Sequence, residues 1–293
     1  MAFADQLPRR LEKLVRDSTA LSRQELREAI EEGRVRVDGE PAALDALVFG
    51  DEDVRLDGRS LELREHQRTV LFHKPAGMTA SLADTHGRTD LSEPLEGMPE
   101  GCAPVGRLDR ETTGALLFTT DGDLLNAVLR PMHHVAKIYR LTLSEWLAED
   151  DPRLRQLVDG VPTALGSLRA DDVRIGTRRA GRVVEDGAPD RGETELWLTL
   201  HEGKNRQIRR MCRGARLRLE HLHRASIGPI ALGDLGEGAW RELGASEVDA
   251  LWDALGGRAH VNQLRRDALA RQARQAREQG SPHLKLERWL GQA

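Results

Sequence analysis

The sequence predicts an α+β protein with a small N-terminal module and a larger second domain, and three observations support this fold class. Two amphipathic helical segments open the chain, short alternating strands follow them, and longer strand patterns then recur between Gly- and Pro-rich loops. Strands and long helices do not alternate strictly, so a doubly wound parallel sheet is not expected. We therefore predict a module at 1–66, a domain with a mixed, mainly antiparallel sheet at 67–256, and a basic helical or mobile tail at 257–293.

Two helices are expected in the N-terminal module. The first is predicted over Pro8–Arg16. Ser22 and Glu25 have the spacing of a capping box that opens the second helix, and Gly33 ends it. The apolar face of this second helix consists of residues at positions i, i+3 and i+4, namely Leu26, Ala29 and Ile30.

Short strands are expected after these helices. Apolar residues alternate with polar ones over 35–37 and 54–56, and each run ends at an Asp-Gly turn pair, at 38–39 and 57–58. In the second domain, longer strand signals recur at Val70–Phe72, Leu116–Thr119, Ile138–Leu143, Glu195–Leu200 and Leu217–Leu222.

The composition excludes several classes of protein. The chain has 293 residues, of which 39% are hydrophobic and 31% charged, as expected for a soluble globular protein. No apolar run approaches the roughly 18 residues of a membrane span, and the first ten residues lack the layout of a secretory signal. Cys102 and Cys212 have no metal-site or disulfide-framework spacing. We expect a cytoplasmic monomer with reduced cysteines and no membrane partner.

The distribution of charge predicts an anionic partner although the net charge of −4 does not. Between residues 202 and 224, eight Lys or Arg stand against two acidic residues. Between residues 257 and 293, eight stand against three. Two basic patches on an acidic protein indicate binding to phosphate groups.

The stretch from Gly106 to Leu124 carries the strongest candidate for chemistry. We expect a strand that runs into Asp109, a polar turn, and a buried strand over Ala115–Thr119. An acid on a tight loop between two core strands is held rigidly, as a nucleophile or general base requires. For an isolated Asp near a turn, a turn cap is the more common role.

Four stretches in order resemble the motifs of pseudouridine synthases. The sequence GRLDRETTGALLFTTDGDL, Gly106 to Leu124, is similar to the family signature G-R-L-D-x-x-T-x-G-L-L-x-x-T-x-D-G, with Ala115 where a larger aliphatic residue is usual. The others are FHKPAGMTAS (Phe72 to Ser81), KIYRL (Lys137 to Leu141) and EGKNRQIRRM (Glu202 to Met211). The resemblance is closest to the RsuA-type branch, which modifies ribosomal RNA.

This resemblance implies a reaction and the residues for it. The family detaches uracil from its glycosidic bond, rotates it and rejoins it through carbon 5, with no cofactor or metal. Asp109 is then the catalytic carboxylate, acting at the sugar or at the base, and Arg209 is the cation beside it. Tyr139 stacks on the uracil and is the expected base, and Arg107 helps to fill the space left by the flipped nucleotide.

The helix expected from about Lys204 divides its faces between packing and charge. A buried stripe is predicted at positions i, i+3, i+4 and i+7, from Ile208, Met211, Cys212 and Ala215. Cations occupy the other side, and besides Arg209 we expect them to bind RNA: Lys204, Arg206, Arg210 and Arg213.

On a strand, Tyr139 shares a side with Leu141 and Leu143, so a core aromatic is the competing interpretation for Tyr139. Lys74 precedes Pro75 in a shaped turn, and no covalent role is expected for it.

The N-terminal module resembles the alpha-L RNA-binding module named after a small-subunit ribosomal protein. The likeness lies in LSRQELREAIEEGRVRVDGE, Leu21 to Glu40. It implies an RNA-facing surface made of Arg23, Arg27, Arg34 and Arg36. Residues 1–39 contain eight acidic and eight basic residues, so a solvated helix face is the competing interpretation and weak binding is expected. The partner is then ribosomal RNA or a ribosome-assembly intermediate.

Two other functions compete with catalysis on RNA. A non-catalytic RNA-binding or ribosome-assembly protein would need neither Asp109 nor Tyr139. A metal-dependent nuclease would use acids and histidines of one region, namely Asp109, Asp121, Asp123 and His133 or His134. Asp121 and Asp123 more simply mark a turn and a helix start. No Gly-rich phosphate loop follows a strand, which disfavours a nucleotide-dependent enzyme.

Overall fold

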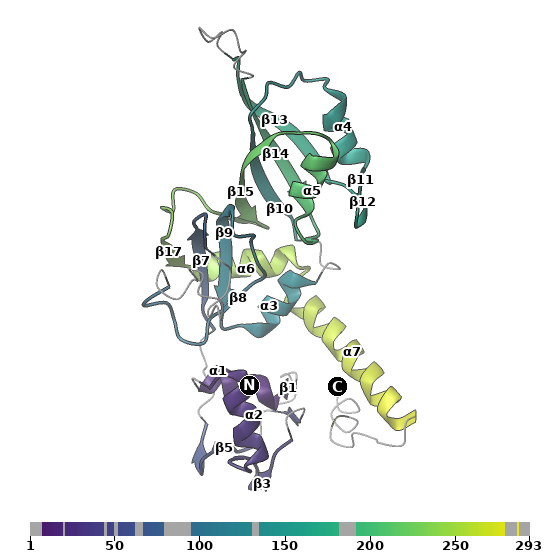
Figure 1. Cartoon of the computed structure of the whole chain (residues 1–293). Helices are drawn as coiled ribbons and strands as arrows, with labels where there is room; N and C mark the ends of the chain where they lie inside the picture. The colour runs from purple at the N-terminus through teal and green to yellow at the C-terminus, as the bar shows by residue number, and fades with distance from the viewer. Residues whose placement is uncertain are drawn as a thin grey trace. The chain divides into compact units, whose positions relative to one another are not determined.

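The protein is an α+β protein in the computed structural model, as the sequence predicts (Figure 1). The structure describes residues 8–19, 21–43, 46–49, 52–61, 67–78, 95–130, 135–181, 192–278 and 286. The chain divides into two compact units: the first comprises Met1–Gln67, Pro99–Cys102 and Gly256–Ala293, and the second comprises Arg68–Met98 and Ala103–Leu255. Among the described helices, none is long and apolar enough to cross a membrane.

The first unit begins with two helices and two small sheets. The helices are α1 (Leu11–Ser18) and α2 (Arg23–Glu31), and a two-stranded sheet pairs β1 (Arg9–Arg10) with β4 (Leu47–Val48). The four-stranded sheet has the order β3-β2-β5-β6, from β2 (Val35–Val37), β3 (Glu40–Pro41), β5 (Val54–Leu56) and β6 (Arg59–Ser60). The first helix starts three residues later than predicted because Arg9 and Arg10 pair with β4.

Local sequence signals determine the second helix and the turns of this unit. The Ser22 Oγ accepts a hydrogen bond from the Glu25 N–H at 3.2 Å, and the Ser22 N–H donates to the Glu25 carboxylate at 2.7 Å, which confirms the predicted capping box. Leu26 and Ala29 are buried in the core. Both predicted Asp-Gly turns are also present, with Asp38 and Asp57 at φ of 51° and 52°.

The basic C-terminal segment forms a helix that packs on this N-terminal module. Helix α7 spans Arg258–Glu278. Ala273 from this helix and Leu286 beyond it form a buried cluster with Phe49, and Leu47 and Leu269 pack against the cluster. The sequence predicted a basic helical or mobile tail here and not this packing, because the thin apolar face of the segment has no partner in its own neighbourhood along the chain.

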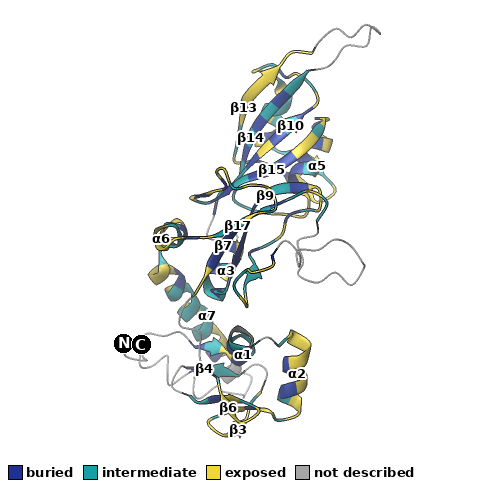
Figure 2. Ribbon diagram, turned by 90° about the vertical axis from the view of Figure 1, so that its left-hand side faces the viewer, coloured by how far each residue is buried: buried dark blue, intermediate teal, exposed yellow. Residues whose placement is uncertain are grey.

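The second unit is built on one mixed, mainly antiparallel sheet, which confirms the predicted class (Figure 1). Its order is β13-β14-β10-β15-β9-β7-β17. The strands are β7 (Thr69–Lys74), β9 (Thr112–Thr119), β10 (Lys137–Leu143), β13 (Asp172–Arg179), β14 (Glu193–Leu200), β15 (Leu219–Ile227) and β17 (Trp240–Glu242), with β8 (Ala103–Pro104) beside β9 and β16 (Ile230–Ala231) beside β15. In Figure 2, β7 is largely buried and the edge strand β13 is largely exposed.

Helices and a small hairpin complete the second unit. The helices are α3 (Gly122–Leu129), α4 (Pro152–Asp159), α5 (Gln207–Gly214) and α6 (Ala245–Ala254), and the hairpin pairs β11 (Val161–Thr163) with β12 (Gly166–Leu168). Asp121 caps α3, since its carboxylate accepts hydrogen bonds from the N–H groups of Asp123 and Leu124 at 2.9 and 3.1 Å. This confirms that Asp121 and Asp123 mark a turn and a helix start.

Two predictions about the strands of this unit were wrong. The chain from Arg107 to Asp109 is not a strand, and β9 already begins at Thr112, so the turn lies earlier than expected. Strand β15 begins at Leu219 and continues to Ile227, five residues beyond the predicted end. Polar residues in these strands obscured the alternation on which the predictions relied.

The two halves of the sheet join where β9 and β15 pair in parallel. Arg224 of β15 lies opposite Gly114 of β9 in this pairing. A Cβ atom on Gly114 would lie 2.2 Å from the Arg224 carbonyl oxygen, and the φ of Gly114 is +109°. Glycine is therefore required at this position for two reasons, close backbone approach and backbone conformation.

We expect Gly114→Ala to destabilise the second unit by at least about 3 kcal/mol, because the added methyl group must push β9 and β15 apart. Urea denaturation followed by tryptophan fluorescence measures this, since four of the five tryptophans lie in the second unit. Gly236→Ala is the control, because a Cβ there would meet nothing within 4 Å. Equal unfolding midpoints for the two variants would contradict the close approach.

Candidate active site

Asp109 lies on the loop between β8 and β9, and the loop is anchored at both ends. The Val105 N–H donates to the Leu117 carbonyl at 2.7 Å, and the Thr112 N–H donates to the Asp109 carbonyl at 3.0 Å. Leu108 is buried beside Asp109. The carboxylate itself keeps 27% of its side-chain surface exposed, so the loop presents an accessible acid on a fixed backbone.

The buried side chain of Lys74 holds this loop in place through hydrogen bonds. Its side chain is fully buried, and its Nζ donates hydrogen bonds to the carbonyls of Pro75, Arg110 and Thr112 at 2.7, 3.1 and 3.0 Å. Burial lowers the pKa of Lys74 to about 8. The three carbonyls use all three donors of the ammonium group. Lys74 therefore joins the turn after β7 to the loop that carries Asp109.

Two arginines face the Asp109 carboxylate. Arg209 Nε and Arg206 Nη1 each lie 3.7 Å from Asp109 Oδ2. The Arg209 side chain is 18% exposed, and its Nη2 donates to the Glu111 carbonyl at 3.0 Å and to Thr112 Oγ1 at 3.3 Å. The sequence predicted Arg209 at this place and assigned Arg206 only to RNA binding.

The geometry of α5 explains how both arginines reach the carboxylate. Ile208, Met211, Cys212 and Ala215 are all buried, which confirms the predicted stripe. Arg206 precedes the helix in a left-handed conformation, with φ of 50°, so its side chain leaves the helical repeat on which the prediction was based. Burial raises the pKa of the Cys212 thiol to about 12, so this cysteine belongs to the packing face.

A cavity of about 230 Å³ adjoins Asp109 and gathers most of the predicted site residues of the second unit. Its lining includes Arg107, Asp109, Tyr139, Lys204, Arg206 and Arg209. Tyr139 is 8% exposed, and Leu141 and Leu143 on the same side of β10 are buried. The side chain of Tyr139 thus continues an apolar face and also lines the cavity.

The cavity contains two further cations that the sequence analysis missed, Lys137 and Arg224. Arg224 is 4% exposed, and its Nε donates to the Ala115 carbonyl at 2.7 Å. Burial and, second, the charge of Arg224 lower the pKa of Lys137 to about 8. Lys137 precedes Tyr139 by two residues in the KIYRL stretch, and this spacing on a strand was the available signal.

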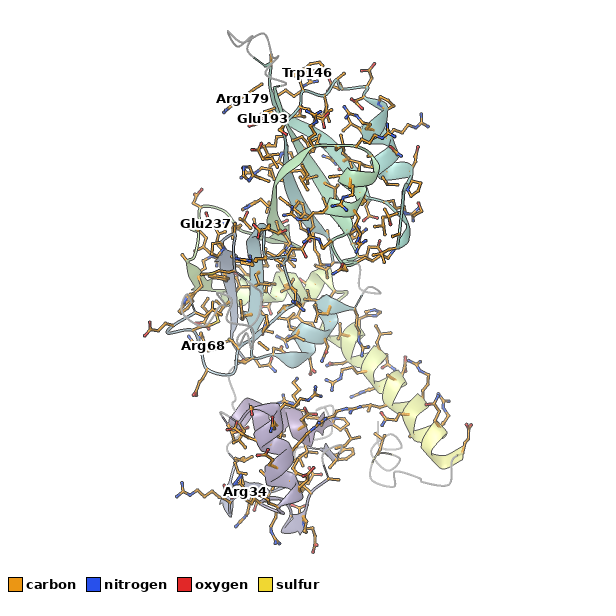
Figure 3. All side chains as sticks on the ribbon, viewed as in Figure 1. Arg34, Arg68, Trp146, Arg179, Glu193 and Glu237 are labelled. Atoms are coloured by element: carbon orange, nitrogen blue, oxygen red, sulfur yellow. The ribbon has the colours of Figure 1, made fainter. Side chains whose placement is uncertain are left out.

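The remaining predicted RNA-binding residues lie outside the cavity. Arg210 donates to the Asn205 carbonyl at 3.0 Å, and Arg213 is exposed. In the first unit, Arg23 pairs with Glu12 at 2.6 Å. Arg34, which is labelled in Figure 3, lies 3.2 Å from Glu32 and 3.4 Å from Asp57.

The other two arginines of the first unit that were predicted to bind RNA are also at its surface. Arg27 is exposed on α2, and Arg36 donates to the Gly39 carbonyl at 2.8 Å. Two of the four arginines are thus paired with acids, which reduces the positive potential of this face.

The described residues contain no group of three or more His, Cys, Asp or Glu side chains that could hold a metal ion. His133 and His134, which the nuclease interpretation requires, lie outside the described residues. What the cavity offers is an accessible carboxylate beside two guanidinium groups, with a buried tyrosine, a buried arginine and a partly buried lysine in the same lining. Such a site can bind an electron-rich planar ring and act on it as a base or nucleophile.

Comparisons with known proteins relate the chain to two family models and to several named proteins. A family model described as RNA pseudouridylate synthase matches residues 68–213, and a model described as S4 domain matches residues 9–45. A protein of Aquifex aeolicus (strain VF5), named uncharacterized RNA pseudouridine synthase, is 33% identical over 250 residues, covering 84% of this chain and 95% of that protein.

A second relative has a more specific name. Ribosomal large subunit pseudouridine synthase B of Bacillus subtilis (strain 168) is 30% identical over 243 residues, covering 83% of this chain and 95% of that protein. A crystal structure of pseudouridylate synthase matches with a TM-score of 0.54 at 23% identity, over 84% of this chain and 100% of that one. The structural likeness concerns the fold.

We expect Lys74→Met to lower the free energy of unfolding of the second unit by about 2–4 kcal/mol, because three carbonyls lose a charged donor. Urea denaturation measures the change. Arg174→Met is the control, since Arg174 is exposed on β13 and its loss should cost less than about 0.5 kcal/mol. A Lys74→Met variant as stable as wild type would show that the ammonium does not hold the loop.

Proposed function

The chain belongs to the RNA pseudouridylate synthase family, and on this premise we propose that it isomerises a uridine of ribosomal RNA to pseudouridine, with Asp109 as the catalytic carboxylate. The observation that carries the proposal is the position of Asp109, 3.7 Å from each of two arginines and beside the cavity that Tyr139 lines. The name of the Bacillus subtilis relative favours large-subunit ribosomal RNA as the first substrate to test.

Asp109 acts at the ribose or at the uracil ring, and in either case it must stay ionised when RNA covers the site. Removing a carboxylate from water disfavours its charged form. Arg206 and Arg209 oppose this effect because each places a permanent positive charge near Oδ2. Arg209 is the more firmly held of the two, since it also bonds to the loop at Glu111 and Thr112.

Tyr139 serves as the stacking surface for the flipped uracil and as the base that removes the proton from carbon 5. Its ring is buried in the cavity lining and continues the apolar face of β10, so its position is fixed by packing. Arg107 is exposed at the same cavity. From this position Arg107 can enter the space that the flipped nucleotide leaves in the RNA stack.

Cations around the cavity and on the N-terminal module bind phosphate groups and position the RNA. In the second unit these are Lys204, Arg206, Arg210 and Arg213, and in the first unit Arg23, Arg27, Arg34 and Arg36. As the family resemblance implies, the isomerisation requires no cofactor. We infer that the protein acts as a monomer on ribosomal RNA or an assembly intermediate in the cytoplasm.

We expect Asp109→Asn to abolish pseudouridine formation while the affinity for RNA stays within about tenfold, since the amide keeps the shape of the side chain and loses its charge. The measurement is a single-turnover assay on ribosomal RNA from cells without this protein, with the dissociation constant measured in parallel. Measurable turnover by Asp109→Asn would refute the catalytic assignment.

Arg209→Ala should affect the catalytic rate, whereas Arg213→Ala should affect RNA binding. Arg209→Ala should lower the rate at saturating RNA by at least about tenfold, because it removes a charge at Asp109 and two bonds to the loop. Arg213→Ala should weaken RNA binding and leave the rate at saturating RNA unchanged. The slope of the logarithm of the binding constant against the logarithm of the salt concentration should become shallower by about one unit. Equal saturated rates for both variants would exclude the role proposed for Arg209.

A further inference from the structure

Arg224 is a buried arginine whose guanidinium is only partly satisfied. Its side chain is 4% exposed, and its Nε donates to the Ala115 carbonyl at 2.7 Å. Its Nη2 is buried and has no hydrogen-bond partner within the described part of the chain. A buried donor without a partner is costly. A hydrogen-bond acceptor on a bound molecule would remove this cost by accepting a hydrogen bond from Nη2.

The strand register places Arg224 beside the groups that the proposed function uses. On β15, Arg224 lies opposite Tyr139 of β10 on one side and opposite Gly114 of β9 on the other. Residues directly opposite each other on neighbouring strands have Cβ atoms about 5 Å apart. Arg224 and Tyr139 both line the cavity next to Asp109.

Lys137 adds a second cation to the same lining. Its Nζ donates to the Val135 carbonyl at 3.2 Å. Neither Lys137 nor Arg224 forms an ion pair among the described residues, and the charge of Arg224 contributes to the lowered pKa of Lys137. Two like charges in the lining of one cavity repel each other, and an electron-rich group beside them would relieve the repulsion.

The proposed reaction produces such a group. When the bond between ribose C1′ and uracil N1 breaks, its electron pair goes to the uracil, and the negative charge spreads over O2 and O4. The ring then turns, C5 forms the new bond to C1′, C5 loses its proton to the base, and N1 gains a proton. The uracil therefore carries most negative charge while it is detached, when only the cavity surrounds it.

We propose that Arg224, assisted by Lys137, donates a hydrogen bond to a carbonyl oxygen of the target uracil and stabilises the charge on the detached ring. This inference rests on the proposed function and adds the residues that recognise the base. A buried arginine in the lining of a cavity suits a planar base, whereas exposed side chains such as Arg213 suit phosphates. Preorganised donors act most strongly where charge develops in the transition state.

The first test compares Arg224→Gln with Arg155→Gln in single-turnover assays at saturating RNA. Arg155 is the matched control because it is exposed on α4, where it pairs with Asp159. We expect Arg224→Gln to lower the saturated rate by about a hundredfold, with the dissociation constant for RNA within about threefold, and Arg155→Gln to behave as wild type. A weakened affinity with an unchanged saturated rate would mean that Arg224 binds a phosphate, and would overturn the proposal.

The second test changes the RNA and leaves the protein intact. Substrates that carry 2-thiouridine or 4-thiouridine at the target position replace one carbonyl oxygen by sulfur, which accepts hydrogen bonds poorly. With wild-type enzyme, one of the two substitutions should slow the reaction by about tenfold, and Arg224→Gln should no longer distinguish that substrate from uridine. Equal rates for uridine and both thio-substrates with wild type would overturn the contact.

Two further outcomes separate this inference from the proposed function. If wild type forms no pseudouridine in ribosomal RNA, the proposed function fails and this inference fails with it. If wild type is active and both tests are negative, only this inference fails. Should Arg224→Gln not fold, as judged by circular dichroism, Lys137→Gln replaces it, with an expected loss of at least about tenfold in saturated rate and refutation by an unchanged rate.

Discussion

The short parallel pairing of β9 with β15 is the contact on which the candidate site depends. It joins the two halves of the sheet, and it requires glycine at position 114 because a Cβ atom would collide with the backbone of Arg224. The Asp109 loop enters β9 at this join, and Tyr139 and Arg224 stand on β10 and β15 beside it. Strain or separation at one backbone contact would therefore move the acid, the tyrosine and the arginine relative to one another.

The second constraint is electrostatic. The cavity holds one carboxylate, Asp109, among several cations that the fold keeps in place by hydrogen bonds to backbone carbonyls. Lys74 acts from beneath the loop, and Arg209 acts from α5. Because these charges are positioned before RNA arrives, binding does not have to reorganise them, and their effect grows as RNA excludes water.

The sequence predicted the parts of the fold and of the site that depend on local pattern. The buried stripe of α5, the Ser22 capping box and the family motifs follow from spacing along the chain, and the family is confirmed. The role of Gly114, the approach of Arg206 to Asp109 and the packing of α7 on the N-terminal module depend on contacts between distant segments. The periodicity of apolar residues along the sequence does not reveal strand register or a left-handed residue before a helix.

Mapping pseudouridine in total ribosomal RNA tests whether Asp109 is the catalytic carboxylate that we propose. The RNA should come from a strain that lacks the protein and carries either the wild-type gene or an Asp109→Asn copy expressed at the same level. We expect one or a few sites that are modified with wild type and unmodified with Asp109→Asn. Identical maps from the two strains would contradict it.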